Sequence, residues 1–130
     1  MEKETQRFIG AFDGSATPNP GNMIIGGYVC DPLGKIVIAF KEDLGYGTNN
    51  EAEYKALIKL ISEIRKKDIQ NISIIGDSAL VVNQINKVWK VKNPRMEVLR
   101  DEALSLMEGL NIKLTHVLRD KNKKADALTR

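Results

Sequence analysis

Apolar residues occur along this chain in short runs at first and at helical spacing later. The runs at 6–12 (QRFIGAF), 23–30 (MIIGGYVC) and 35–41 (KIVIAFK) are rich in strand-forming residues, so each is predicted to be a strand. The turn signal at 31–34 (DPLG) predicts a hairpin that makes the second and third of these strands antiparallel neighbours.

The pattern then changes to a helical period. A helix is predicted to open at Thr48, with Asn49 or Asn50 as its N-cap, and to run to about Lys67. Its apolar stripe consists of Leu57, Leu60, Ile61 and Ile64. The remaining predicted elements are a buried strand at 71–76, a helix from Asp77 and Ser78 to about Asn86, a helix from about Arg95 to Gly109, a strand at 112–118 and a helix from Asn122 to Arg130.

This order of elements predicts an α/β fold. Three strands joined by short connections, followed by strands reached through helices, form a mixed sheet with helices packed on its faces. If the strand at 71–76 lies parallel to the strand at 6–12, their C-terminal ends meet where α/β sheets place their functional sites.

Composition and charge exclude only a few classes of protein. The chain has 130 residues, 42% hydrophobic and 28% charged, which predicts a single globular domain over 1–130. The net charge of +3 permits a polyanionic partner without requiring one. No apolar run approaches the length of a membrane span, and the lone Cys30 cannot form an internal disulfide, so we expect a cytoplasmic protein.

Two aspartates directly follow predicted strands. Asp13 ends the strand at 6–12 and opens a turn rich in Gly, Pro and Asn, and Asp77 ends the strand at 71–76. If the two strands are parallel neighbours, the two carboxylates lie about 5 Å apart, and their repulsion calls for a cation between them. The alternative is that each is a turn or cap residue, Asp77 especially, because Asp favours a helix N-terminus.

The first helix offers two glutamates with opposite predicted environments. On a helical wheel Glu53 lies within roughly 40° of the apolar stripe and points toward the sheet. Glu51 lies roughly 120° from the stripe and is predicted to face solvent and to pair with Lys55. A glutamate at the head of a buried stripe needs a partner, so Glu53 is predicted to join Asp13 and Asp77.

Asp126, in the last predicted helix, is the fourth candidate; alone it is equally an ordinary first-turn aspartate. Four carboxylates on four elements would form a site of hard oxygen ligands, which suits Mg²⁺ or Mn²⁺ better than zinc. Two such ions bridged by carboxylates are used for in-line phosphodiester cleavage. A calcium loop starting at Asp13 is excluded, because Pro18 and Ile24 occupy the positions that require Gly and Glu.

Four segments together resemble type 1 ribonuclease H. They are FDGSATPNPG, TNNEAEYKAL, GDSALVVNQI and NKKADALTR, which occur in the family's order and cover nearly the whole chain. The resemblance implies a ribonuclease H-like mixed five-stranded sheet in the order 3-2-1-4-5, with strands 1–3 antiparallel, strands 1-4-5 parallel, and helices on both faces. It also implies Mg²⁺-dependent cleavage of the RNA strand of RNA–DNA hybrids. We expect the protein to be a monomer. The implied catalytic and metal-binding residues are Asp13, Glu53, Asp77 and Asp126.

The same resemblance implies a set of substrate contacts. Asn49 and Asn50 fall where the family contacts the hybrid through the minor groove, and Gly14 and Ser15 would bring backbone close to the RNA. Thr48 with Asn19 would hold a phosphate of the DNA strand. Small polar groups of this kind suit a wide minor groove in which the 2′-OH distinguishes RNA from DNA.

The chain also departs from the family's pattern. Ala79 stands where many members have a hydrogen-bonding Gln, and the short connection after 112–118 has no room for the loop that carries a helper histidine in some relatives. The only histidine, His116, falls inside a predicted strand and is assigned a structural role, which leaves Arg119 or water as the helper.

The segment 87–94 is too short for the extra basic helix of some members. Trp89, Lys90 and Lys92 would supply part of that grip by stacking and phosphate contact, or Trp89 simply packs against the next helix. Two further functions stay open: a non-catalytic module that binds hybrid or double-stranded RNA, and a broader nuclease that also cuts double-stranded RNA.

Overall fold

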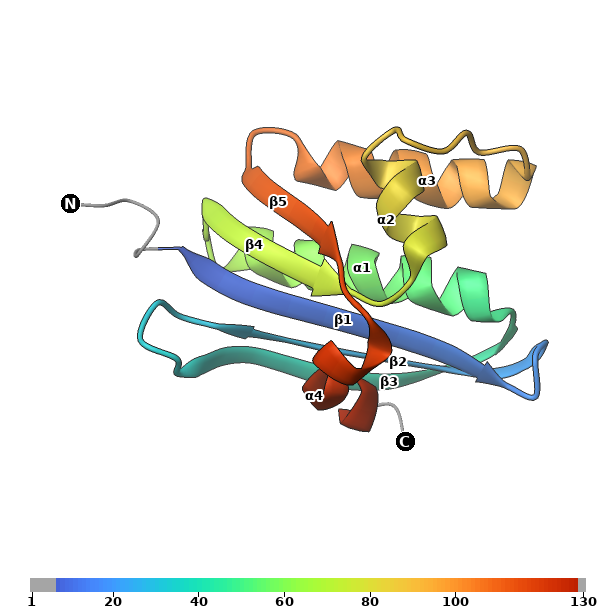
Figure 1. The fold of residues 1–130 in the computed structure, drawn as a ribbon, viewed down its shortest axis with the longest axis horizontal. Coiled ribbons are helices and arrows are strands. Elements are labelled where there is room, and N and C mark those ends of the chain that lie inside the picture. The colour runs from blue at the N-terminus through green and yellow to red at the C-terminus, as the bar shows by residue number, and fades with distance from the viewer. Residues whose placement is uncertain (1–6, 129–130) are drawn as a thin grey trace.

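Five strands form one mixed sheet in the computed structural model of the protein, which describes residues 7–128 (Figure 1). The strands are β1 Phe8–Thr17, β2 Gly21–Cys30, β3 Ile36–Gly47, β4 Asn71–Gly76 and β5 Asn111–His116. Their order is β3-β2-β1-β4-β5. β1, β2 and β3 pair antiparallel, whereas β1, β4 and β5 pair parallel. The predicted strand order and directions are therefore confirmed.

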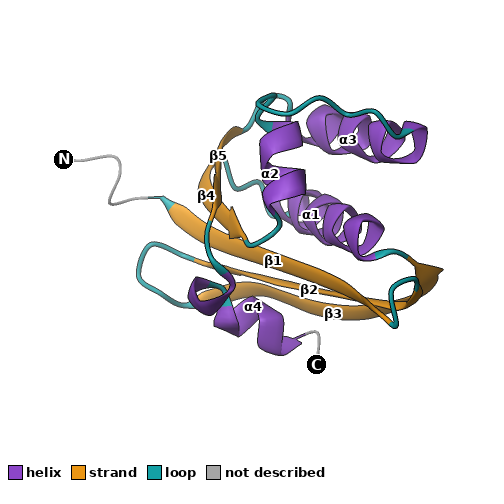
Figure 2. Ribbon diagram, turned by 45° about the vertical axis from the view of Figure 1, so that its right-hand side comes forward, coloured by secondary structure: helices purple, strands orange, loops and turns teal. Residues whose placement is uncertain are grey.

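Helices lie on both faces of this sheet. They are α1 Asn49–Lys66, α2 Ala79–Ile85, α3 Pro94–Met107 and α4 Lys123–Leu128, the last preceded by a 3₁₀ turn at Arg119–Lys121. Figure 2 shows α1, α2 and α3 on one side of the sheet and α4 on the other, where it contacts β1 and β2. The 3₁₀ turn was not predicted. After it, α4 starts one residue later than the sequence predicts.

The hydrophobic core lies between the sheet and α1. Leu57, Leu60, Ile61 and Ile64, the predicted stripe, are all fully buried, as are Phe12, Ile72 and Ile74 of the facing strands. Burying each of these side chains stabilises the fold by about 1.5–3 kcal/mol. Gly76, the last residue of β4, packs directly against Phe12. A Cβ on Gly76 would lie only 2.4 Å from the Phe12 ring. The core thereby fixes where the pairing of β1 with β4 stops relative to α1.

β1 is longer than predicted, so Asp13 lies within a strand and not at its end. The parallel pairing with β4 stops at Phe12↔Gly76, but the antiparallel pairing with β2 continues from Asp13↔Gly26 to Thr17↔Asn22. The turn is restricted to 18–20. The predicted turn at Asp13 is therefore wrong, because the hairpin partner holds the chain extended, while the predicted meeting of Asp13 with the end of β4 is correct.

The start of α1 also differs from the sequence prediction. Thr48, not Asn49 or Asn50, is the N-cap: its side chain accepts the Glu51 N–H at 3.1 Å, and the Glu51 carboxylate accepts the Thr48 N–H at 2.9 Å. This reciprocal capping box satisfies two backbone donors that have no partner within the helix. Within residues 7–128, no helix has the length and apolar character needed to cross a membrane.

Candidate active site

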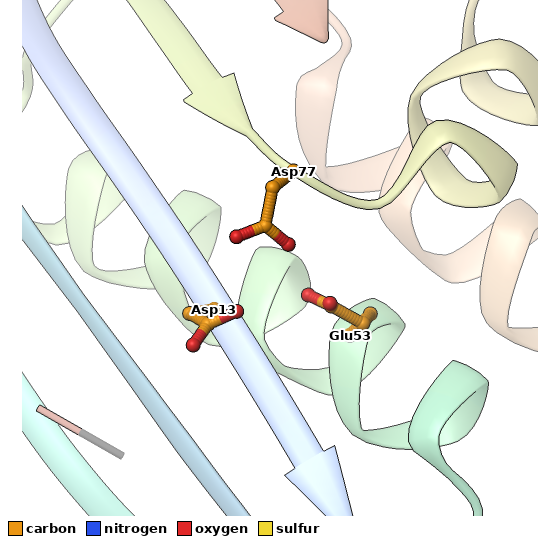
Figure 3. A group of neighbouring side chains, drawn as sticks. All are labelled: Asp13, Glu53 and Asp77. Carbon is orange, nitrogen blue, oxygen red and sulfur yellow. The ribbon is translucent and has the colours of Figure 1, made fainter. Parts of the chain in front are cut away.

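Three carboxylates meet at the point where β1 and β4 separate. Asp13 lies on β1, Asp77 directly follows β4, and Glu53 lies in the first turns of α1 (Figure 3). One oxygen of each carboxylate lies within 4.8 Å of the other two. Asp13 and Glu53 are buried, and Asp77 is half-buried. The predicted convergence of these three residues, and the choice of Glu53 over Glu51 as its member, match this geometry.

The backbone of β1 brings Glu53 into position. The Gly14 N–H donates to Glu53 Oε1 at 3.1 Å, so the strand that carries Asp13 also orients the glutamate on the helix. This contact depends on a close approach of strand and helix, because a Cβ on Gly14 would lie 2.3 Å from the backbone oxygen of Ala52. The glycine predicted to approach RNA is thus required for packing of β1 against α1.

The cluster is electrostatically unfavourable as it stands. The pKa of Glu53 is raised to about 9, chiefly by burial and further by the charges of Asp13 and Asp77. The Gly14 N–H and the positive charge of Arg119 act in the opposite direction. A divalent cation bound among these oxygens would lower the pKa of Glu53 and favour its ionised form. All three ligands are hard oxygen donors, so the site fits Mg²⁺ or Mn²⁺.

The fourth predicted ligand, Asp126, belongs to α4, but its side chain lies outside the described residues. What the structure describes is how α4 is attached. Ala125 is fully buried, and the Lys124 Nζ lies 4.9 Å from the centre of the Tyr28 ring on β2, a cation–π contact. These contacts attach α4 to β1 and β2, on the face of the sheet opposite α1.

Glu51 does not face solvent as predicted. Only 7% of the residue is exposed, and its carboxylate caps α1 and pairs with Arg95 at 2.8 Å, rather than with Lys55. The helical wheel considers α1 alone, whereas α3 packs beside it and supplies Arg95 at its first turn. The prediction was wrong because the partner comes from a distant part of the chain.

The residues predicted to contact substrate gather around the N-terminus of α1. Asn19 Oδ1 accepts the Asn49 N–H at 3.0 Å, and Asn49 Oδ1 accepts the Ala16 N–H at 2.6 Å. These bonds hold the turn after β1 against the start of the helix. Asn50 is exposed and Ser15 is half-buried.

A second group of predicted contacts lies on the segment between α2 and α3. Trp89 is 46% exposed, and Lys90 and Lys92 are exposed as well. The buried Tyr54 hydroxyl lies 2.5 Å from Gln84 Oε1, and the Gln84 amide reaches the Lys90 carbonyl at 3.5 Å, which ties the segment to α1. Arg119 is exposed near Glu53, and His116 is exposed at the end of β5.

Sequence reasoning missed Asn122. Its side-chain amide donates to the Phe12 carbonyl at 3.0 Å and lies 3.4 Å from Asp77 Oδ2. The sequence offered only one signal, an asparagine four residues before Asp126, and that position is equally typical of a helix cap.

The sheet order and the buried carboxylates define a protein of the ribonuclease H-like fold class. Residues 11–130 match the family model described as reverse transcriptase-like. The chain is 36% identical over 118 residues to ribonuclease HI of Halobacterium salinarum, covering 90% of this chain and 59% of that protein. It therefore spans less than two thirds of that curated relative.

Solved structures agree with this similarity. The crystal structure of RNase H1 from Halobacterium salinarum superposes with a TM-score of 0.89 at 35% identity, covering 94% of this chain and 93% of that one. LC11-RNase H1 in complex with an RNA/DNA hybrid gives a TM-score of 0.87 at 30% identity, with coverage of 94% and 93%. The chain belongs to the ribonuclease HI family.

Proposed function

We propose that this protein is a metal-dependent endonuclease that hydrolyses the RNA strand of RNA–DNA hybrids. The observation that carries the proposal is the convergence of Asp13, Glu53 and Asp77 within 4.8 Å, at the point where β1 and β4 separate. Buried like charges are costly unless they bind a cation, so a cluster of buried carboxylates is typical of a catalytic metal site. The similarity to LC11-RNase H1, whose structure contains an RNA/DNA hybrid, supports the choice of substrate.

Asp13, Glu53 and Asp77, together with Asp126, would hold Mg²⁺, with Mn²⁺ as a substitute. With substrate present, two such ions would activate a water for in-line attack on the phosphodiester and stabilise the leaving oxygen, giving 3′-OH and 5′-phosphate ends. The protein's own contribution is to hold the carboxylates in position before substrate arrives. The Gly14 N–H orients Glu53, and the register of β1 against β4 sets Asp13 beside Asp77.

Substrate selection is proposed to come from the turn and helix start beside the carboxylates. Asn49 and Asn50, with Gly14 and Ser15, would read the minor groove of the hybrid, where the RNA strand presents its 2′-OH. Thr48 and Asn19 would hold a DNA phosphate. The Asn19–Asn49 and Asn49–Ala16 hydrogen bonds would keep this surface in one shape in the free protein.

Binding strength is proposed to come from the basic segment between α2 and α3. Lys90 and Lys92 would contact phosphates and Trp89 would stack, so hybrid affinity would fall steeply with salt. Arg119 would act as the helper in place of a histidine. The monomeric state and the cytoplasmic location stay predictions.

The experiment is hydrolysis of an end-labelled RNA–DNA hybrid in Mg²⁺, compared with double-stranded RNA and double-stranded DNA. Wild-type protein is expected to cut only the RNA strand of the hybrid and to lose this activity in chelator. Asp13→Asn should be inactive, and Asp101→Asn, which changes an exposed carboxylate on α3, should be fully active. Hybrid binding without any cleavage, unaffected by Mg²⁺, would instead indicate a binding module. Cleavage of double-stranded RNA would indicate a broader nuclease.

A further inference from the structure

Asn122 occupies an unusual place for an asparagine that directly precedes a helix. It lies between the 3₁₀ turn and α4, and only 2% of it is exposed. Its side chain extends toward the sheet, where its Nδ2 lies 3.0 Å from the Phe12 carbonyl oxygen and 3.4 Å from Asp77 Oδ2. One amide group therefore contacts β1 at the residue before Asp13 and also contacts Asp77 itself.

The chemistry of the two neighbours fixes the orientation of this amide. A carbonyl and a carboxylate are both acceptors, so the nitrogen, with its two hydrogens, has to face them. The opposite orientation would place Oδ1 against two other oxygens. In this orientation both hydrogens are available to acceptors, one on β1 and one on the residue that follows β4.

This orientation has a consequence for the oxygen. Oδ1 is buried and has no hydrogen-bond partner among the residues that the structure describes. An asparagine before a helix usually gives this oxygen to a backbone N–H of the first turn. Asn122 forgoes that bond, so its conformation serves the contacts with Phe12 and Asp77 and not the capping of α4.

We propose that Asn122 is a positioning residue of the carboxylate site. Its Nδ2 holds the Asp77 carboxylate toward Asp13 and Glu53, and its bond to Phe12 attaches the start of α4, the helix of Asp126, to β1. The amide is neutral, so it orients Asp77 without neutralising the charge that a cation requires. The proposal rests on the proposed role of the cluster in binding metal, but it does not depend on which substrate is cut.

The test measures metal binding rather than cleavage. Binding of Mn²⁺ alone is titrated calorimetrically to the full-length wild type, Asn122→Ala and the isosteric Asn122→Asp, which replaces the donor with another carboxylate. Groups that orient metal ligands typically contribute about 10- to 100-fold in metal affinity, and a loss in this range is expected for Asn122→Ala. The Mn²⁺ affinity of Asn122→Asp should differ from that of Asn122→Ala, because the added carboxylate attracts the cation while repelling Asp77.

Asn86→Ala is the matched control. Asn86 also follows a helix end and donates its Nδ2 to a backbone carbonyl, that of Leu114, at 3.0 Å, but on β5. The Asn86→Ala substitution should lower the melting temperature and leave the Mn²⁺ affinity unchanged. If Asn122→Ala likewise lowers only the melting temperature, its role is structural and the proposal is overturned.

A measurement on the wild type covers the case in which the variants fail to fold. The side-chain amide resonances of Asn122 and Asn86 are followed by NMR during a Mg²⁺ titration. The Asn122 signal should shift with the same saturation curve as the backbone amide of Asp77, whereas the Asn86 signal should not. An unmoved Asn122 signal would overturn the proposal. Metal binding with normal Asn122 behaviour but without hybrid cleavage would contradict the proposed function alone.

Discussion

Two buried glutamates near the N-terminus of α1 have opposite electrostatic surroundings. Glu51 and Glu53 are two residues apart and equally buried, each with 7% of the residue exposed. On the side facing α3, the Glu51 carboxylate pairs with the guanidinium of Arg95 and accepts the Thr48 N–H at the helix start. On the side facing the sheet, Glu53 meets two more carboxylates.

The difference distinguishes a glutamate whose partner belongs to the fold from a glutamate whose surroundings suit a bound cation. Arg95 shows that the fold can supply a cation to a buried glutamate in this helix, so the carboxylate surroundings of Glu53 are not a general property of the region. A buried charge left among like charges destabilises the free protein, and such an arrangement is retained where a ligand supplies the missing charge. Four experiments test this contrast, from the largest expected effect to the smallest.

The first experiment removes each charge in turn while keeping the shape. Glu53→Gln is expected to reduce the rate of hybrid cleavage at saturating Mg²⁺ by at least about 100-fold, because a metal ligand is lost. Glu51→Gln should change the rate by less than about threefold, since its partner is Arg95. Initial rates on the labelled hybrid measure both. Equal losses in the two variants would remove the contrast.

The second experiment follows stability against pH in chelator. The pKa of Glu53 is raised from 4.5 to about 9 in the folded state, so between these values the native state binds a proton that the unfolded chain releases. The unfolding free energy should therefore fall as pH rises through this window, by up to about 1.4 kcal/mol per pH unit. Urea titrations at several pH values measure it.

Two matched samples sharpen that measurement. Glu53→Gln cannot ionise, so its stability should depend less on pH across the window. Mg²⁺ should flatten the wild-type curve as well, because a bound cation keeps the carboxylate ionised in the native state. Parallel curves for wild type and Glu53→Gln would show that Glu53 does not carry the effect.

The third experiment disturbs only the side facing the sheet. In Gly14→Ala the new Cβ would lie 2.3 Å from the Ala52 oxygen, so β1 and α1 have to separate. We expect the unfolding free energy to fall by about 1–3 kcal/mol, the range for overpacked sites, and the Gly14–Glu53 hydrogen bond to be strained. Denaturant unfolding checks the loss, with Ser15→Ala as the neighbouring control that should remain near wild type. A neutral Gly14→Ala would mean that the strand and helix are not held at this distance.

The fourth experiment measures the pairing on the other side. A double-mutant cycle with Glu51→Gln and Arg95→Gln should give a coupling of about 0.5–1 kcal/mol, because the Arg95 side chain is 74% exposed and solvent screens the pair. The Glu42–Lys59 pair, at 2.9 Å but with both side chains more open than Glu51, is the comparison and should couple less. A larger coupling at Glu42–Lys59 would contradict the view that burial of Glu51 gives its pair its strength.

These contrasts also show what the sequence alone could predict. The hydrophobic period gave the order of elements, and with the wheel it assigned Glu53 to the sheet, because both depend on local spacing. The surroundings of Glu51 depend on a residue 44 positions away, and the contacts of Asn122 on residues 45 and 110 positions away, which no local pattern reports. The turn-forming neighbours of Asp13 predict that a turn starts there, but pairing with β2 overrides that propensity.

The continued pairing of β1 past Asp13 determines which changes in chain length the site tolerates. Side chains of a strand alternate between the two faces of a sheet, so an insertion of one residue between Phe12 and Asp13 would turn Asp13 to the face away from its partners. An insertion at 18–20 lies beyond the last pair of the hairpin and would lengthen the turn while leaving Asp13 opposite Gly26. Variation in the β1–β2 turn can thus alter the surface that meets a substrate without moving the chemistry.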